Sequence, residues 1–291
     1  MSARLVRIRT LAVPTQTQQS KNEEVTLNIV VCTKQVPDTA ATLKVDEQSN
    51  VSWGDAPLVI NPWDEYAIEE GIRLKEKFGG KVTVLSVGPE QAKEALKQAV
   101  AMGCDEAQLI SDPAFEGSDA LATTHILAQA IKKLGDVDVI VFGKQAIDGD
   151  TGLVPAGVAR RLGWPLLSYV AKIDELDVAA KSIKVTRLLE QGRQGVASKL
   201  PAVISVVKEI NEPRYPSFMN IRKASKLPIP TLNAATIGTD AGKVGKANAA
   251  AQWIKTFPLP ARTGNVELIS GDSPQAIAAA LADKLMADKV I

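Results

Sequence analysis

Short apolar runs alternate with amphipathic helical segments from residue 27 onward. Residues 27–33 form the first run, and similar runs rich in β-branched side chains follow at 81–87, 106–110, 137–142 and 202–207. Each run has the length of a strand and is nearly continuous in apolar residues, which is typical of parallel strands buried on both faces. The pattern predicts an α/β fold, a doubly wound and mainly parallel sheet with helices on both faces.

Capping residues mark the starts of the expected helices. Asn61 followed by Pro62 predicts one start, Ser118 or Asp119 a second, and Ser273 a third. Short polar side chains accept hydrogen bonds from the first free amides of a helix. The last helix, residues 273–286, has no strand after it. We therefore expect it to dock on the core or on another chain.

Three segments depart from the alternation. Residues 182–199 have β-branched character without a following helix, and the chain after Pro228 is rich in Ala, Gly and Thr up to about residue 251, which is typical of a linker. Residues 1–26 carry three arginines but lack the apolar segment of a secretory signal. We expect a disordered leader over 1–26, an α/β domain over 27–230, and a linker with a C-terminal arm and helix over 231–291.

Composition and charge exclude several classes of function. In 291 residues, 34 basic side chains balance 33 acidic ones, which gives no basic field for nucleic acid. No apolar run approaches the roughly 20 residues of a membrane helix. Two cysteines and one histidine cannot form a disulfide framework or a zinc site of their own, so we expect no metal and a reducing compartment.

The candidate chemistry lies where the strands end. In an open α/β sheet ligands bind beyond the carboxyl ends of the strands, and residues 32–38, 87–89 and 143–152 follow three of them. The last loop is the best anion site, because Gly149 and Gly152 permit close backbone approach and Asp150 or Thr151 could cap a helix reaching about Leu162. A Gly-rich strand-to-helix turn is also an ordinary connection.

Sharper catalytic and nucleotide motifs are missing. The sequence contains neither G-x-G-x-x-G after a strand, nor a Walker A loop, nor G-x-S-x-G, and His125 lies within a helical pattern. Cys32 and Cys104 form no C-x-x-C pair, and we interpret them as buried thiols. No residue is predicted to be catalytic. This combination favours a protein that holds a nucleotide or cofactor whose chemistry belongs to the cofactor.

At six stretches the sequence resembles the beta subunit of electron transfer flavoprotein. They read VCTKQVPD at 31–38, INPWDEYAIEE at 60–70, GKQAID at 143–148, VTRLLEQGRQ at 185–194, LPAV at 200–203 and NEPRYPS at 211–217. One departure is Gln191, where the family usually has Gly or Asp. The resemblance implies a Rossmann-like, adenine-nucleotide-binding core and a heterodimer with an alpha subunit, which carries the electron-transferring FAD.

The resemblance also implies a ligand site in this chain. By motif, the cofactor-binding residues are Cys32, Thr33, Lys34, Asn61, Asp64, Gly143, Gln145, Asp148, Gly149, Asp150, Thr151, Gly152 and Val154. Simple carriers of the family hold AMP there as a structural ligand. Electron-bifurcating members hold a second FAD that reacts with NADH, and their loop resembles the Asp-Gly-Asp-Thr of residues 148–151. We favour FAD, since the two glycines leave room for a pyrophosphate, with AMP as the alternative.

Partner contacts follow from the same resemblance. The family docks a dehydrogenase through an apolar anchor that corresponds to Phe218, and the predicted partner-binding residues are Arg187, Glu190, Gln194, Tyr215, Phe218, Ile221 and Arg262. The expected partners are the alpha subunit, an acyl-CoA or related dehydrogenase, and a ferredoxin, flavodoxin or quinone oxidoreductase as acceptor. We expect a cytoplasmic protein, with the mitochondrial matrix as the alternative. A stand-alone nucleotide-sensing domain is a more distant alternative.

Overall fold

The computed structural model describes residues 26–258, 260, 263–264 and 266–291. The predicted leader lies almost wholly outside the described residues, and so does Arg262. The chain divides into two units. The first runs from the start of the described residues to Thr42 and from Trp53 to Trp253, and the second comprises Leu43–Ser52 and Ile254–Ile291.

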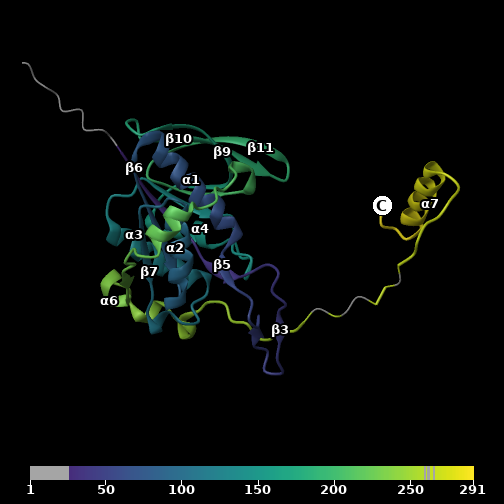
Figure 1. Ribbon diagram of the computed structural model, residues 1–291, viewed down its shortest axis with the longest axis horizontal. Coiled ribbons are helices and arrows are strands. Elements are labelled where there is room, and N and C mark those ends of the chain that lie inside the picture. Colours follow the sequence, from purple (N-terminus) through teal and green to yellow (C-terminus); the bar gives the residue numbers. More distant parts are fainter. Residues whose placement is uncertain (1–25, 259, 261–262, 265) are drawn as a thin grey trace, which may run out of the picture. The chain divides into compact units, whose positions relative to one another are not determined.

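A sheet of nine strands forms the centre of the first unit, in the order β11-β10-β9-β12-β8-β1-β6-β7-β13 (Figure 1). The strands from β12 through to β13 are parallel to their neighbours, and β12 is also parallel to β9. The chain builds β1, β6 and β7 outward on one side and then crosses to β8 on the other side of β1, which makes the β1/β8 boundary the switch point of a doubly wound fold. The strands are β1 (Leu27–Cys32), β6 (Gly80–Val87), β7 (Glu106–Ile110), β8 (Val139–Gly143), β9 (Leu166–Asp177), β10 (Ser182–Leu189), β11 (Gly192–Lys199), β12 (Ala202–Val206) and β13 (Thr231–Leu232).

The helices cover both faces of this sheet. Ile29 and Val31 of β1 belong to a core cluster with α1 (Pro62–Phe78) and α2 (Lys93–Met102), whereas Val30 and Cys32 belong to a second cluster with α3 (Ala120–Leu134) and α4 (Val154–Leu162). Successive side chains of a strand point to opposite faces, so a strand covered on both sides must be apolar throughout. The predicted fold class is confirmed.

The predicted strand-rich segment at 182–199 is a hairpin. β10 and β11 pair antiparallel through all eight of their residues, and β10 also pairs with β9. The three strands extend the sheet beyond β12, with register shifts on both sides of β9. A smaller sheet pairs β2 (Gln35–Pro37) with β5 (Leu58–Ile60).

The segment after Pro228, expected to be a linker, folds onto the sheet instead. Thr231 and Leu232 pair with β7, α6 (Ala234–Ile237) follows, and Ile237 and Val244 are buried. Its Ala, Gly and Thr content gave no apolar periodicity, because only a few side chains reach the core. α5 (Phe218–Ala224) precedes this segment, and short 3-10 turns lie at Glu90–Ala92, Pro113–Phe115, Lys208–Ile210, Ala241–Lys243 and Lys246–Asn248.

The second unit is small. Its first part contains the paired strands β3 (Lys44–Val45) and β4 (Val51–Ser52), and its last part contains α7 (Pro274–Ala287). Ser273 caps α7 as predicted, since its hydroxyl accepts a hydrogen bond from the amide of Ala276. α7 has no buried residue, and Leu281 and Met286 are exposed. No helix among the described residues is long and apolar enough to cross a membrane.

Candidate functional site

A cavity of about 960 Å³ lies in the first unit beyond the carboxyl ends of β1, β6, β7 and β8. It occupies the switch point of the sheet, where strand-end loops diverge to opposite faces and leave a crevice. Two loops contribute most of its wall: the β8 loop (residues 143–153) and the β7 loop (residues 111–119). The start of α4 closes one end of the cavity through Val154 and Pro155.

The structure gathers the predicted cofactor residues around this cavity. Those that line it are Cys32, Thr33, Lys34, Asp64, Gly143, Gln145, Asp148, Gly149, Asp150, Thr151, Gly152 and Val154. Asn61 lies behind the wall and is fully buried. Asn61 is the N-cap of α1 as predicted, but its side chain makes no cap bond. It reaches the β8 loop instead, where Nδ2 donates to the Gln145 carbonyl at 2.8 Å and Oδ1 accepts from the Ile147 amide at 3.1 Å.

Asp64 joins the first-strand loop to α1. Its carboxylate accepts the amide N–H of Lys34 at 2.8 Å, and only 7% of the residue is exposed. Burial raises the pKa of Asp64 to about 7, against the opposing effect of this and other hydrogen bonds. Burial, together with the Asp64 charge, also raises the pKa of the neighbouring Cys32 thiol.

Gly143 shows how closely β8 approaches α1. A Cβ added there would lie 2.6 Å from the carbonyl carbon of Trp63 and 2.5 Å from Oδ1 of Asp64. Only glycine leaves space for this contact. The next residue, Lys144, points away from the cavity, and its ammonium lies 5.2 Å from the Trp63 ring centroid and 5.8 Å from that of Tyr169.

The β8 loop presents backbone to the cavity. Asp150 and Gly152 have φ values of 55° and 59°, in the left-handed region that Asp tolerates and Gly favours. The expected cap from Asp150 or Thr151 is wrong: Leu153 is the N-cap of α4, and it makes no side-chain cap bond. Among the described residues no side chain caps α4, and its second residue, Pro155, has no N–H, so the first turn offers the amides of Val154 and Ala156 where the helix meets the cavity. Such amides suit an anion.

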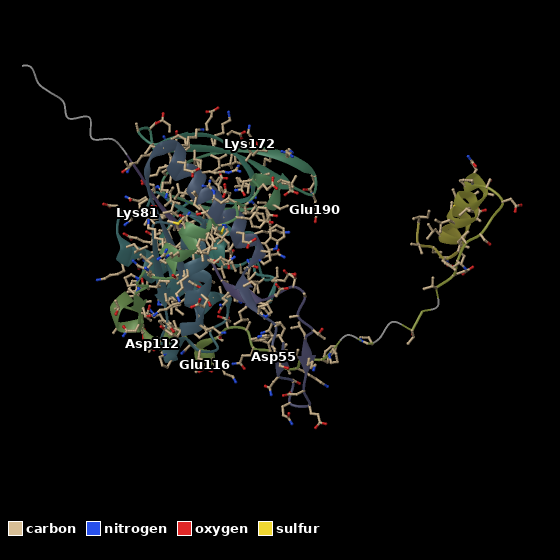
Figure 2. All side chains as sticks on the ribbon, viewed as in Figure 1. Asp55, Lys81, Asp112, Glu116, Lys172 and Glu190 are labelled. Atoms are coloured by element: carbon tan, nitrogen blue, oxygen red, sulfur yellow. The ribbon has the colours of Figure 1, made fainter. Side chains whose placement is uncertain are left out.

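The charges around the cavity are mainly acidic. Lys34 is the one Lys or Arg among the lining residues that the structure describes, and its ammonium pairs with Asp148 at 2.6 Å. Asp112 and Asp119 line the β7 loop, but their carboxylates accept backbone amides, those of Ala114 and Ala234 for Asp112 and of Ala122, Ala250 and Ala251 for Asp119. Figure 2 labels Asp112 and Glu116, two acidic residues of the β7 loop that line the cavity.

One buried hydroxyl of the cavity lining lies near the Asp64 carboxylate but makes no well-formed hydrogen bond among the described residues. Thr33 Oγ1 is buried, and among the described residues it has no hydrogen-bond partner of normal geometry. A buried hydroxyl left unpaired costs free energy, and a ligand that bonds it removes this cost. The cavity thus offers a free hydroxyl, uncapped amides and one ammonium, which fits a phosphate-bearing ligand.

Sequence reasoning missed the β7 loop as part of the wall. Its residues Ser111, Phe115 and Ser118 line the cavity beside Asp112 and Asp119, yet the loop carries no glycine-rich pattern. The order of the strands could have identified it, since the loop follows the predicted strand 106–110. Ser118 and Asp119 were interpreted only as helix caps, and Asp119 does cap α3.

The predicted partner residues lie at two other places. Arg187 and Gln194 are paired residues of β10 and β11, and Nη1 of Arg187 donates to Oε1 of Gln194 at 3.2 Å. Glu190 is exposed at the turn between these strands (Figure 2). Tyr215, Phe218 and Ile221 are exposed, by 96%, 79% and 49%. Arg262 lies outside the described residues.

Comparisons with known proteins agree on one family. The model of the electron transfer flavoprotein domain matches residues 54–237. An electron transfer flavoprotein subunit beta from Megasphaera elsdenii is 39% identical over 91% of this chain and its own full length. Protein FixA from Azotobacter vinelandii is 38% identical over 89% of this chain and 94% of its own. The caffeyl-CoA reductase-Etf complex subunit CarD from Acetobacterium woodii is 38% identical over 91% of this chain and its own full length.

Proposed function

The chain belongs to the electron transfer flavoprotein family as a beta subunit, and from this premise we propose that its cavity binds FAD. The volume of about 960 Å³ carries the proposal. Pockets for small molecules span about 300–1,000 Å³, and AMP corresponds to only one half of FAD. A cavity at the upper end of that range supports a dinucleotide.

The residues at the cavity suit the middle of such a ligand. The uncapped amides of α4 and the backbone of the β8 loop would bind a pyrophosphate, with Lys34 as the balancing cation. Thr33 Oγ1 would bond a ribose or ribityl hydroxyl. FAD, when bound, would supply hydride acceptance from NADH and one-electron transfer. The protein residues would bind and orient it and exclude water.

We further propose that the chain works in electron bifurcation. NADH would be the electron donor. One electron would pass to the alpha-subunit FAD and its dehydrogenase, and the other to a low-potential acceptor such as ferredoxin or flavodoxin. A quinone oxidoreductase is the alternative acceptor. The Asp-Gly-Asp-Thr sequence at 148–151 supports this reading. The similarity to a subunit of a caffeyl-CoA reductase-Etf complex supports an acyl-CoA or related dehydrogenase as partner.

AMP as a structural ligand is the second candidate. The observation in its favour is the single lining cation, Lys34, which already pairs with Asp148. The phosphate of AMP presents its charge at one position, which one ammonium can contact, whereas a pyrophosphate spreads its charge over two phosphates. In that case electrons would travel only through the alpha-subunit FAD.

A double variant of the β8 loop tests where the ligand binds. Asp150→Ala with Thr151→Ala should empty the cavity, because Asp150 accepts a bond from the Gln145 side chain and holds a left-handed conformation that costs Ala about 1 kcal/mol. The flavin content of the co-purified alpha–beta complex is measured. Asp174→Ala, in the β9 extension, is the control. Full flavin content in the double variant would contradict the placement.

Docking of the dehydrogenase is proposed at the exposed side chains near α5. We define the docking surface as Tyr215, Phe218, Met219 and Ile221, whose apolar area is exposed on one short stretch. Phe218→Ala should weaken electron exchange with the dehydrogenase without changing bound flavin.

The proposed contacts of the alpha subunit are Arg187, Glu190, Gln194 and Arg262, together with α7. The bacterial relatives support a cytoplasmic location.

A further inference from the structure

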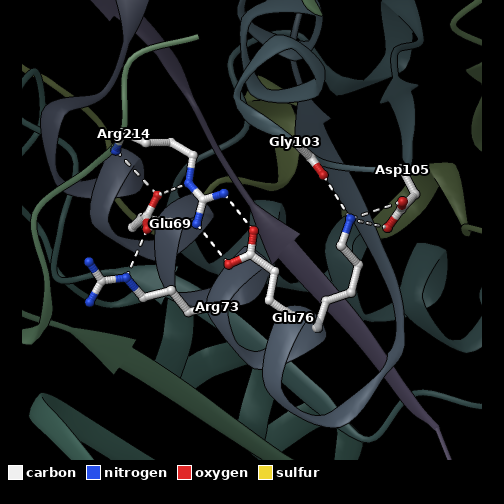
Figure 3. Close-up of polar contacts among 7 residues, drawn as sticks. Glu69, Arg73, Glu76, Gly103, Asp105 and Arg214 are labelled. Atoms are coloured by element: carbon white, nitrogen blue, oxygen red, sulfur yellow. Dashed lines mark hydrogen bonds and ion pairs between the residues drawn. The ribbon is translucent and has the colours of Figure 1, made fainter. Parts of the chain in front are cut away.

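A partly exposed ion-pair network, built on the buried carboxylate of Glu69, fixes the segment that precedes the docking surface. Arg214 donates through Nε and Nη2 to Glu69 at 2.8 and 3.1 Å, and through Nη1 and Nη2 to Glu76 at 2.6 and 3.0 Å. Its backbone amide also donates to Glu69, at 3.2 Å. Figure 3 shows the guanidinium held between the two carboxylates. We call these three residues the Arg214 clamp.

The bonds that meet at Glu69 restrict the movement of the clamp. Glu69 is only 2% exposed and accepts a further bond from Arg73 at 2.8 Å. Burial alone would raise the pKa of Glu69, but the bonds from Arg214 and Arg73 outweigh it and lower that pKa. A planar guanidinium that binds two carboxylates fixes both distance and orientation, which a single ammonium cannot do.

A second contact anchors the same segment three residues earlier. Asn211 Nδ2 donates to the Tyr66 carbonyl and to Glu70, both at 3.0 Å. On the other side of the docking surface, Ala224 is buried in the core cluster that includes α2. The chain is thus held at 211–214 and at 224. Between these points Phe218 and Met219 stay exposed, by 79% and 70%.

The helix that supplies both glutamates of the clamp also contributes to the cavity lining. α1 places Asp64, in its first turn, at the cavity and reaches Glu69 and Glu76 farther along. Lys75, between them, fixes the same helix to the neighbouring turn by donating to the Gly103 carbonyl at 2.9 Å and to Asp105 at 3.0 Å (Figure 3). One rigid element therefore sets the position of the docking surface relative to the cofactor cavity.

We propose that Arg214 is a positioning residue for partner docking, which holds the docking surface preformed on α1. The inference rests on the proposed docking of a dehydrogenase at Phe218. The partner that fits the docking surface has an apolar pocket with an acidic rim, because exposed positive charges at Arg222, Lys223 and Lys226 follow the apolar side chains in the same short stretch. Because this surface is ordered before binding, association with the partner does not lose the entropy of ordering it.

Hydrogen exchange of the co-purified alpha–beta complex tests the preformed state. Arg214→Gln should speed amide exchange of residues 215–222 roughly tenfold or more, because it removes the guanidinium bonds to both glutamates and leaves only the backbone bond to Glu69. Lys75→Met is the matched control, since it removes a comparable contact of α1 that does not touch this segment. Unchanged exchange in Arg214→Gln would overturn the inference.

Kinetics with a short-chain acyl-CoA dehydrogenase as the probe test the role in docking. Arg214→Gln should raise the KM for the dehydrogenase roughly tenfold, with kcat and flavin content unchanged, because the lost order must be restored on binding. Arg214→Lys, which keeps the charge but not the fork, should fall between this variant and wild type. Flavin loss in Arg214→Gln would overturn the inference, since it would indicate general damage.

A double variant separates this inference from the proposed function. If Arg214 acts through the docking surface, Arg214→Gln should add little to the KM once Phe218→Ala is present. Fully additive effects would overturn the positioning role while leaving the docking site in place. An unchanged KM in Phe218→Ala alone would instead overturn the proposed docking site, and with it the role of the clamp in docking.

Discussion

Replacing Asp64 with Asn should change how the stability of the protein depends on pH. The side chain keeps its shape and loses its charge, and the amide oxygen of Asn can take the place of Asp64 Oδ2 as the acceptor for the Lys34 amide. Burial raises the pKa of Asp64 in the folded state to about 7, from an ordinary value of 3.8. The folded protein therefore holds a proton on Asp64 over a pH range in which the unfolded chain has already lost it.

The sign and the size follow from this difference. Below about pH 4 both states are protonated at Asp64, so the residue adds no pH dependence. Between about pH 4 and pH 7 the free energy of unfolding falls as the pH rises, by about 1.4 kcal/mol for each pH unit. Relative to Asp64→Asn, the wild type should lose about 4 kcal/mol over this range, and the difference stays constant above it.

Urea unfolding of the full chain, followed by circular dichroism from about pH 4.5 to pH 8, measures the effect. The Asn variant should gain stability relative to wild type as the pH rises. Asp55→Asn, at an exposed loop position, reports the general effect of removing one carboxylate. Parallel curves for wild type and Asp64→Asn would refute the reasoning, because Asp64 would then titrate as an ordinary solvated carboxyl.

Other contacts of the cavity predict further outcomes. Gly143→Ala should lower the free energy of unfolding by about 1–3 kcal/mol. Gly149→Ala, where a Cβ would meet no atom within 4 Å, should leave Tm unchanged. Equal Tm values for the two variants would contradict the close contact at Gly143. Asn61→Ala should cost roughly 1–3 kcal/mol and reduce bound flavin, measured by absorbance, because the Gln145 carbonyl and the Ile147 amide lose their partner; unchanged flavin would count against it. Burial raises the pKa of Cys104 to about 12 and that of Cys32 as well, so iodoacetamide should alkylate both only after unfolding, as mass spectrometry would show. Rapid alkylation of the native protein would contradict the burial.

Local pattern was enough to predict the sheet and the place of the cavity, but not the contribution of the β7 loop to its wall. The strand at 106–110 has the predicted bounds, and the helix cap at Asp119 is confirmed, because both depend on neighbours in sequence. The crevice follows from strand order alone once the strands are known. Assigning cofactor residues within it needed the family motifs.

What could not be predicted depends on contacts distant in sequence. Asn61 is the N-cap residue of α1, but its side chain donates to a carbonyl 84 residues away. Arg214 donates to Glu69, which lies 145 residues away in the sequence. The segment after Pro228 lacks apolar periodicity, yet Thr231 and Leu232 pair with β7 and extend the sheet. Each outcome follows from tertiary partners that override local preference.

The nucleotide content of the co-purified alpha–beta complex tests the central claim most directly. Ligands are released by heat, and FAD and AMP are quantified per heterodimer by chromatography. The proposal predicts two FAD and no AMP, one FAD in each subunit. One FAD with one AMP would contradict it, and would make this chain the structural half of a simple electron carrier.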